Sequence, residues 1–412
     1  MKIVIIADHA SINGGQAKVA IESAKGLAAR GHAVTYFAAV GPVDAGLLAA
    51  GVKTILLEQP DVVSASSLTL FGLQWFWNAP AARRLREFLS TCDRNETVVH
   101  VHGWAKALSP SIGPVLKASK LAIVFTMHEY FLVCPNGGFY DYPVGHACHR
   151  RPMSLACIAH NCDSRSYFRK LLRVTRHAAL QHSGLLDCLD HVITISRLQR
   201  EILERHLPAN VHFHNVGNPI DTPPLGQKDD AIPGDFVFVG RISPEKGPLL
   251  FAEAARLSGQ RAVFIGDGPQ AETLKAQYPE AAVLGWKDPA EVRKLLRRAR
   301  ALVFPSVWYE GQPLTVLESL ALGTPVIVSD MCAGREFVED GVSGRWFRSN
   351  DASSLAAAMA ELADDGVAWR MSQAAYSLYW KDPYTLERHL DGLCAVYDEA
   401  LGVEEKAVCA MT

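Results

Sequence analysis

Short apolar runs of strand length alternate with helix-length stretches along most of the chain. In the first half these runs lie at 2–7, 97–101, 121–126 and 191–195. In the second half they lie at 236–240, 262–266, 301–305 and 325–329. Runs that are apolar throughout, separated by amphipathic stretches such as 16–30, indicate parallel sheets covered by helices on both faces. The pattern predicts an α/β protein with two Rossmann-like units.

A polar stretch rich in Pro, Asp and Gly, ending at Gly234, interrupts the pattern between the two halves. The chain has 412 residues, more than the roughly 250–300 that usually share one hydrophobic core, so two domains are expected. We place the first domain at 1–217 and the second at 218–385. Ligands of open α/β sheets bind beyond the carboxyl ends of the strands, so we expect the active site in the cleft between the domains.

Three motifs follow strands of the second domain. They are Gly240-Arg241 with Lys246-Gly247, then Gly266-Asp267-Gly268, and finally Glu310 and Glu318 separated by seven residues. We predict Pro313 as the first residue of the helix that carries Glu318, because its missing amide costs nothing there. The amides of Leu314, Thr315 and Val316 would then be free at a helix N-terminus, where they attract phosphate.

The charged residues of these motifs suggest a division of roles. Glu318 lies one turn into the helix, and its side chain leans back toward the N-terminus, where it reaches a ribose diol. Glu310 precedes the helix and faces a sugar. Arg241 and Lys246 offset the charge of a departing pyrophosphate. No Asp-x-Asp pair is present to hold a divalent ion, so we expect catalysis without a metal. The motifs together predict a site for a nucleotide-sugar diphosphate.

In these motifs the chain resembles the GT-B-fold retaining glycosyltransferases of family 4, also called group 1. The likeness runs from Lys2-Ile-Val-Ile-Ile through Gly14-Gly15 and Thr126-Met-His128 to the paired glutamates. One departure is Gly-Gln-Pro at 311–313, where many family members carry Gly-Phe-Gly. The resemblance implies an acceptor-side first domain, a donor-binding second domain, and C-terminal helices, about 386–412, that return to complete the first. It also implies retention of anomeric configuration by a front-face displacement.

Further contacts are expected around the donor. Gly14 and Gly15 follow the first strand, and their backbone can approach the donor closely. The resemblance implies that His128 contacts the donor sugar and that the turns of Gly240, Gly266 and Gly268 contact the nucleotide. His100 and His102 end a strand on the acceptor side, where a structural role is an equal alternative.

A long irregular segment after the third strand carries Cys134, Cys148, Cys157 and Cys162. Four soft ligands are suited to a tetrahedral structural zinc site, with separate thiols as the alternative. The spacing does not match a CxxC ribbon. With nine cysteines scattered through the chain, we otherwise expect reduced thiols.

Basic and aromatic residues gather in two stretches of the first domain. Trp75, Phe76 and Trp77 precede Arg83, and a second stretch carries Arg169, Lys170 and Arg173 at helical spacing. Such residues suit a rim that contacts a membrane holding a lipid-linked acceptor. A helix packed on the first domain with solvated arginines is the alternative.

The bulk properties limit the partners and the location. A formal net charge of −2 gives no nucleic-acid signature. The first apolar run is too short for a secretory signal, and no run reaches the roughly 18 apolar residues of a membrane span. We therefore expect a cytoplasmic protein, with peripheral contact at the inner face of the cytoplasmic membrane.

The function predicted is transfer of a sugar from a UDP- or GDP-sugar to a glycan or lipid-linked acceptor, with no cofactor required. Two alternatives stay open. A GT-B sugar-nucleotide epimerase or a phosphorylase shares the architecture, and a catalytically silent scaffold that binds sugar nucleotides belongs to another class. The charged positions that transfer requires are all present, which disfavours the scaffold.

Overall fold

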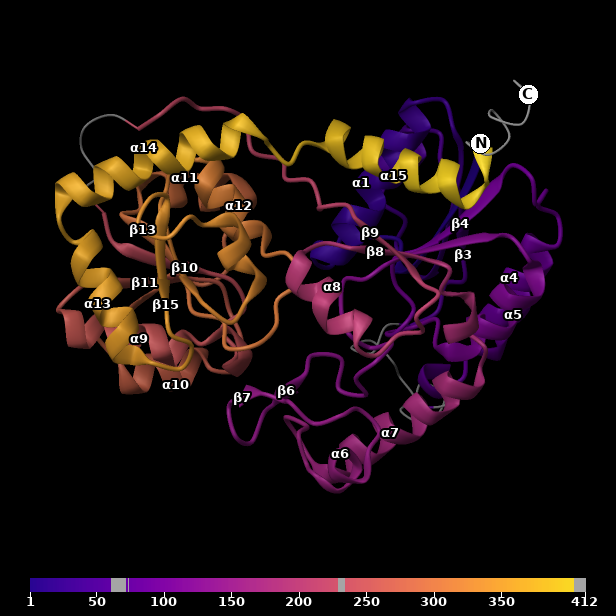
Figure 1. Cartoon of the computed structure of the whole chain (residues 1–412), viewed down its shortest axis with the longest axis horizontal. Coiled ribbons are helices and arrows are strands. Elements are labelled where there is room, and N and C mark those ends of the chain that lie inside the picture. Colours follow the sequence, from indigo (N-terminus) through magenta and orange to yellow (C-terminus); the bar gives the residue numbers. More distant parts are fainter. Residues whose placement is uncertain (61–71, 73, 229–233, 404–412) are drawn as a thin grey trace.

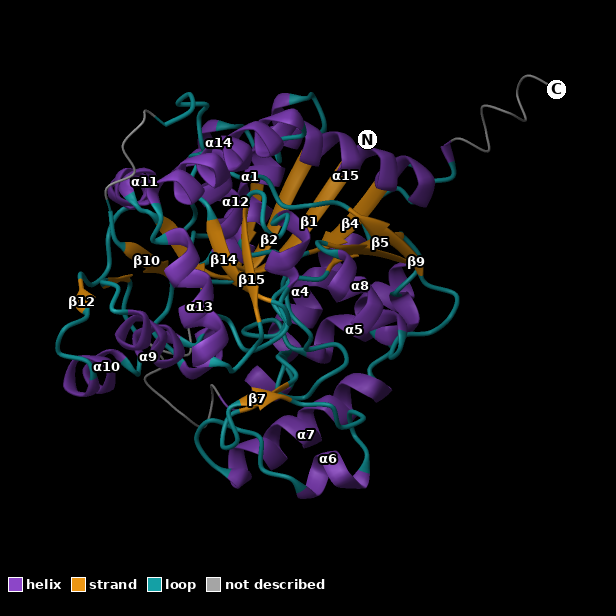
Figure 2. Cartoon of the chain, turned by 60° about the vertical axis from the view of Figure 1, so that its left-hand side comes forward, coloured by secondary structure: helices purple, strands orange, loops and turns teal. Residues whose placement is uncertain are grey.

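The structure, a computed structural model, describes residues 1–412 except 61–71, 73, 229–233 and 404–412. Two α/β domains lie side by side, each built on a parallel sheet (Figure 1). Helices cover both faces of these sheets (Figure 2). The fold class predicted from the apolar pattern is confirmed.

The first sheet has seven parallel strands in the order β3-β2-β1-β4-β5-β8-β9. They are β1 (Lys2–His9), β2 (Ala33–Val40), β3 (Lys53–Leu56), β4 (Thr97–Val101), β5 (Ala122–Thr126), β8 (His191–Thr194) and β9 (His212–Asn215). The strand order reverses between β1 and β4. Ligands bind at such a reversal, beyond the carboxyl ends of the two strands.

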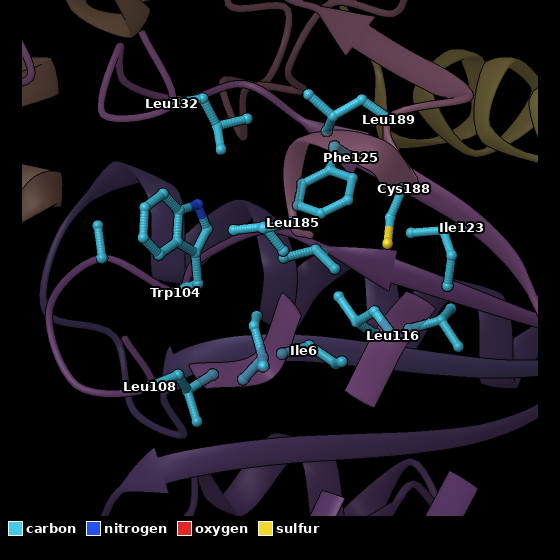
Figure 3. Packing of buried hydrophobic residues seen from close by; sticks show 14 of the residues in the cluster. Ile6, Trp104, Leu108, Leu116, Ile123, Phe125, Leu132, Leu185, Cys188 and Leu189 are labelled. Atoms are coloured by element: carbon cyan, nitrogen blue, oxygen red, sulfur yellow. The ribbon is translucent and has the colours of Figure 1, made fainter. Parts of the chain in front are cut away.

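Two clusters of buried residues cover the two faces of this sheet. Ile3 and Ile5 face α1 on one side, whereas Val4 and Ile6 face α4 and α5 on the other, as strand alternation requires. Figure 3 shows part of the second cluster, in which Ile6 packs among Trp104, Leu116 and Phe125. The helices of this domain are α1 (Gly15–Ala29), α2 (Ala45–Ala49), α4 (Ala79–Leu89), η1 (Pro110–Ile112), α5 (Gly113–Ser119), η2 (Leu186–Cys188) and α8 (Arg197–Glu204).

The second sheet has six parallel strands in the order β12-β11-β10-β13-β14-β15. They are β10 (Phe236–Val239), β11 (Ala262–Ile265), β12 (Ala282–Val283), β13 (Ala301–Phe304), β14 (Val326–Ser329) and β15 (Gly344–Phe347). The helices are η3 (Pro244–Lys246), α9 (Pro248–Ser258), α10 (Ala271–Gln277), α11 (Pro289–Arg298), α12 (Leu314–Ala321), η4 (Ala333–Phe337), α13 (Ala352–Leu362) and α14 (Asp365–Lys381). Here the order reverses between β10 and β13, whose following loops carry Arg241 and Glu310.

The two C-terminal helices pack on different domains. α14 lies against α12 of the second domain, whereas α15 (Leu386–Ala400) lies against α1 of the first (Figure 1). Leu390, Leu393 and Tyr397 of α15 belong to the buried cluster of the first sheet. We keep the boundary between residues 217 and 218 as a proposal; it falls just after β9.

An insertion between β5 and β8 carries the cysteine-rich segment. It contains a two-stranded antiparallel sheet, β6 (Tyr140–Asp141) and β7 (His146–Ala147), followed by α6 (Leu155–Ala159) and α7 (Tyr167–His182). These elements form the lower edge of the molecule in Figure 1. No helix in the described part of the chain is long and apolar enough to cross a membrane.

The structure gives the structural zinc site no support. Among the described residues, Cys134, Cys148, Cys157 and Cys162 form no group of three whose thiols converge within metal-binding reach. Instead, the ammonium of Lys170 lies 3.5 Å from the Cys157 sulfur. The segment is held by ion pairs of buried aspartates, in which Asp141 contacts Arg150 at 3.0 Å and Asp163 contacts Arg173 at 2.9 Å. These ion pairs are among the contacts that hold the segment together.

Two of the four basic residues expected at a membrane rim do not face solvent freely. Lys170 is 1% exposed, and Arg173 is held by its ion pair with Asp163. Trp75 is half-buried, because the guanidinium of the buried Arg176 stacks 4.6 Å from its ring. The prediction is wrong for Lys170. Arg83, Arg169 and Trp77 remain exposed, and Phe76 is half-buried.

Candidate active site

A partly buried ion pair joins two of the second-domain motifs. The Lys246 ammonium donates a hydrogen bond to Glu310 Oε1 at 2.7 Å, and the Ser306 hydroxyl donates to the same oxygen at 2.5 Å. Lys246 ends η3 after β10, and Glu310 lies in the loop after β13. Glu310 is only 8% exposed, so these hydrogen bonds replace the contacts with water that its carboxylate loses on burial. Lys246 also lies 5.6 Å from the centre of the Trp308 ring, a cation–π contact.

The glycine turns after β10 and β11 allow two loops to approach closely. Gly266 has φ +137°, and a Cβ there would come 2.0 Å from the Gly240 carbonyl oxygen. A Cβ on Gly268 would come 2.4 Å from the carbonyl oxygen of Ile242. Hydrogen bonds from the Ile242 amide to Asp267 and from the Gln270 amide to Ile242 join the loops. A side chain at either position would push the two loops apart, which explains why both residues are glycine.

The N-terminus of α12 differs by one position from the prediction. Pro313 is the N-cap rather than the first helical residue, with φ −77° and ψ 101°. The Val316 amide donates to the Pro313 carbonyl at 3.1 Å, so it is not free as expected. The amides of Leu314 and Thr315 keep the predicted position at the helix start. Of the three backbone amides that we expected to be free, that of Val316 is therefore used inside the first turn of the helix.

Glu318 lies on the half-buried side of α12. Burial raises the pKa of its carboxyl, and the positive charges of Lys18 and Arg293 oppose the shift. Lys18 belongs to α1 of the first domain, which shows that Glu318 lies within electrostatic reach of that domain. Arg241 is exposed and makes no ion pair with another described residue. Its guanidinium is therefore available to an anion.

The first domain brings its glycine turn toward α12. A Cβ on Gly15 would lie 3.8 Å from the Leu314 side chain, so the two N-terminal turns face each other across the domains. Gly14 caps α1 with φ 154° and has open space around it. The buried Asp8 carboxylate holds the neighbouring loop by accepting hydrogen bonds from the amides of Lys106, Ala107 and Leu108, at 2.8–3.0 Å.

Three histidines connect the carboxyl ends of β4 and β5. His102 Nδ1 lies 3.1 Å from His128 Nε2, and the two rings stack at 5.3 Å. His100 lies beneath, with hydrogen bonds to the hydroxyls of Tyr397 at 2.6 Å and Thr126 at 2.7 Å. Burial lowers the pKa of His128 to about 3, so its imidazole is neutral near pH 7. A cavity lined in part by Gln16, His102 and His128 opens beside this network.

Several residues of this region carry no motif and were missed in the sequence. Gln312, in the departing Gly-Gln-Pro segment, accepts a hydrogen bond from the Asn218 amide and donates to the Asn218 carbonyl at 3.4 Å. It therefore fastens the α12 turn to the connection between the domains. Burial and, next, the Glu310 carboxylate raise the pKa of Tyr130, which places this first-domain phenol near the ion pair. In the sequence, the only signal for these contacts was Gln312, which departs from the Gly-Phe-Gly of many family members.

The cysteine-rich insertion packs against the loop that leads to Glu310. A Cβ on Gly138 would lie 2.6 Å from the Trp308 ring, and the Tyr309 hydroxyl lies 3.4 Å from His149 Nδ1. Asn350 of the second domain donates to the Gly145 carbonyl at 3.3 Å. The insertion therefore contacts the second domain beside the Lys246–Glu310 pair.

Two family models match the chain in succession. The model described as Glycosyltransferase Family 4 matches residues 13–223, just over half of the chain, and the model described as Glycosyl transferases group 1 matches residues 227–378.

Curated relatives share part of this sequence. The UDP-Gal:alpha-D-GlcNAc-diphosphoundecaprenol alpha-1,3-galactosyltransferase of Escherichia coli is 33% identical over 34% of this chain and 38% of its own. The lipopolysaccharide 1,6-galactosyltransferase of Salmonella typhimurium is 28% identical over 42% of this chain and 52% of its own. The aligned regions thus span about half or less of the length of these relatives.

Solved structures share the fold over nearly the whole chain. HepE of Anabaena, in complex with UDP, has a TM-score of 0.64 at 14% identity and covers 97% of this chain and 100% of its own. Sucrose-phosphate synthase from Thermosynechococcus elongatus has a TM-score of 0.69 at 19% identity and covers 98% of this chain and 99% of its own. The two facing α/β domains have the GT-B arrangement.

Proposed function

We propose that this chain, which belongs to glycosyltransferase family 4, transfers a sugar from a nucleotide diphosphate donor to a glycan or lipid-linked acceptor. One observation carries the proposal. Lys246 and Glu310, from loops that follow two neighbouring strands, form a partly buried pair, and the amides of Leu314 and Thr315 begin the helix that follows the Glu310 loop. A cation, a carboxylate and a helix N-terminus together suit a sugar joined to a pyrophosphate.

The residues divide between the two halves of the donor. Arg241, Lys246 and the amides of α12 bind the pyrophosphate, and Glu318 accepts hydrogen bonds from the ribose. The turns of Gly240, Gly266 and Gly268 bring backbone groups to the nucleotide, and Gly14 and Gly15 close over the donor from the first domain. Glu310 positions the sugar, and neutral His128 exchanges a hydrogen bond with one of its hydroxyls.

The reaction proceeds with retention through a front-face displacement. The acceptor oxygen bonds to the anomeric carbon on the side from which the phosphate leaves. The bond between that carbon and the phosphate oxygen breaks, and the acceptor proton passes to the departing phosphate. Arg241 and Lys246 stabilise the negative charge that develops on the leaving group. No divalent metal takes part.

The names of the relatives indicate which donors and acceptors to consider first. HepE was solved with UDP and with UDP-glucose, and the Escherichia coli relative is named for a UDP-galactose donor and a diphosphoundecaprenol acceptor. We accordingly favour a UDP-sugar over a GDP-sugar, and a lipid-linked glycan of polysaccharide assembly as the acceptor. The insertion lies beside the Glu310 loop, and we propose that it binds the acceptor.

A lipid-linked acceptor requires contact with the membrane surface. The outer face of α7 exposes Phe168 by 68% and Leu172 by 41%, and the nearby Leu155 of α6 is 86% exposed. Arg165 and Arg169 are exposed on the same segment. Apolar and basic side chains side by side suit a peripheral contact with anionic lipid. We propose this surface, rather than Lys170, as the contact with the inner face of the cytoplasmic membrane.

The test is a transfer assay with candidate UDP- and GDP-sugars and membrane-extracted acceptors. If the chain is a glycosyltransferase, labelled sugar should move into the glycolipid fraction only when donor and acceptor are both present. Conversion of the donor alone would indicate an epimerase, and a need for inorganic phosphate would indicate a phosphorylase. Nucleotide binding without turnover across a broad acceptor panel would favour the silent scaffold.

A further inference from the structure

Three histidines and a glutamate gather at the amino ends of the last two strands of the first sheet. His191 begins β8, His212 begins β9, and His214 lies two residues further along β9. His191 pairs with His212 across the parallel strands, so alternation puts all three imidazoles on one face. Glu399, near the C-terminal end of α15, reaches this group. The candidate active site lies at the opposite, carboxyl ends of the strands.

The ligand atoms of this group converge. His191 Nδ1 lies 3.1 Å from His214 Nε2, and Glu399 Oε1 lies 3.9 Å from each of these nitrogens. His212 Nδ1 lies 3.7 Å from the same carboxylate oxygen. Among the described residues, His191, His214 and Glu399 form the only group of three potential metal ligands that meet so closely.

These separations suit a tetrahedral metal ion. Zinc–nitrogen bonds of about 2.0–2.1 Å place two ligands of a tetrahedron about 3.3 Å apart. The histidine nitrogens already have nearly that separation. The Glu399 carboxylate is 48% exposed at a helix end, so it can move the few tenths of an ångström that remain. The histidine side chains are 14% and 16% exposed, so partial burial holds their rings in place.

A single hydrogen bond between His191 and His214 is the simplest alternative, because neutral imidazoles can donate and accept one. It leaves unexplained why the Glu399 carboxylate, from α15, approaches both of these nitrogens. Two imidazoles and a carboxylate are ligands typical of zinc and its neighbours.

We propose that His191, His214 and Glu399 bind a divalent ion of the zinc class. The ion joins the end of α15 to the edge of the first sheet. α15 supplies Leu393 and Tyr397 to the core of that domain, and Tyr397 bonds to His100 beneath the cavity. The metal therefore clamps a helix that follows the second domain in sequence onto the first domain.

Titration of the chelator-treated full chain with zinc chloride, and separately with cobalt(II), tests the site. We expect one ion per chain, a higher melting temperature, and slower hydrogen exchange in the amides of α15. Glu399→Gln and His214→Gln should each weaken zinc binding by about tenfold or more, in line with the loss of a ligand interaction. His182→Gln, an exposed histidine on α7 outside the group, should bind as the unaltered chain does.

The cobalt spectrum separates this site from the cysteines. Ligation by imidazole and carboxylate gives the visible bands of tetrahedral cobalt without thiolate charge transfer in the near ultraviolet. Charge-transfer bands would place the ion at the thiols and overturn the proposal. Equal zinc affinity in Glu399→Gln, His214→Gln and the unaltered chain would also overturn it, as would the absence of binding. Both variants alter partly exposed side chains, and folding is checked by circular dichroism before titration.

Discussion

Replacement of Lys246 by methionine tests whether the Lys246–Glu310 ion pair serves stability alone or also catalysis. Methionine keeps most of the aliphatic length of lysine but removes the ammonium that donates to Glu310 at 2.7 Å. Glu310, 8% exposed, is then left with the Ser306 hydroxyl as its hydrogen-bond partner among the described residues. The variant thus removes a cation from the proposed pyrophosphate site and leaves a carboxylate without its counter-ion.

The two losses have different expected sizes. A hydrogen bond to a charged group contributes roughly 1.5–3 kcal/mol, and the Lys246 side chain is 24% exposed, so we expect a loss of about 2 kcal/mol in the free energy of unfolding. Transfer should fall by about 10²-fold or more, as for other groups that stabilise charge in a transition state. Urea unfolding and initial rates of sugar transfer measure the two quantities.

A double variant provides the decisive comparison. In Lys246→Met/Glu310→Gln the unpaired charge is gone, so the free energy of unfolding should recover much of the loss. Transfer should stay low, because both proposed contacts with the donor are absent. Lys275→Met, which alters an exposed lysine of the same domain, is the matched control and should change neither quantity. Recovery of transfer in the double variant would refute the reasoning.

Three further predictions follow from other parts of the molecule. Transfer assayed well below the melting temperature should survive EDTA, because Arg241 and Lys246 neutralise the leaving group; loss of activity that manganese or magnesium restores would contradict this. Burial lowers the pKa of His177 and of His389 to about 4, against 6.5 for an unperturbed imidazole. The unfolded chain therefore binds more protons below about pH 6.5, and each residue should lower stability by about 2 kcal/mol between about pH 8 and about pH 5. Urea midpoints that stay constant as the pH is lowered would exclude this destabilising effect of His177 and His389. Finally, Phe168→Ser/Arg169→Glu should reduce sedimentation with anionic vesicles at low salt, whereas Arg298→Glu should not, and equal sedimentation of both variants would rule out the proposed membrane surface.

The sequence was sufficient for the features that strand periodicity determines. The predicted apolar runs located β1, β4, β5, β8, β10, β11, β13 and β14 to within one or two residues, but β2, β3, β9, β12 and β15 were not predicted. The motifs after the predicted strands had to meet at the carboxyl edge of each sheet. The reversal of strand order beside β10 and β13 then explains why Lys246 and Glu310 meet, although 64 residues separate them. Local pattern and parallel topology together determine this pair.

Contacts between distant segments could not be predicted in this way. Helical spacing put Lys170 among basic residues, but the stripe of Lys170, Val174 and His177 faces inward, and only the packing of the insertion decides this. Gln312 looked like a departure from a family pattern, and its pairing with Asn218 depends on how the domains are connected. The four clustered cysteines suggested either a zinc site or separate thiols, whereas the ion pairs of Asp141 and Asp163, which no pattern indicated, hold the segment.

The most direct test of the account is calorimetric titration of UDP into Glu318→Ala, Glu310→Gln and the unaltered chain. Glu318 is proposed to hold the ribose through charge-assisted hydrogen bonds of roughly 1.5–3 kcal/mol each, so Glu318→Ala should weaken UDP binding by about 10- to 100-fold. Glu310→Gln should bind UDP as the unaltered chain does and lose only sugar transfer. Unchanged UDP affinity in Glu318→Ala, or equal losses in both variants, would contradict the proposed donor site.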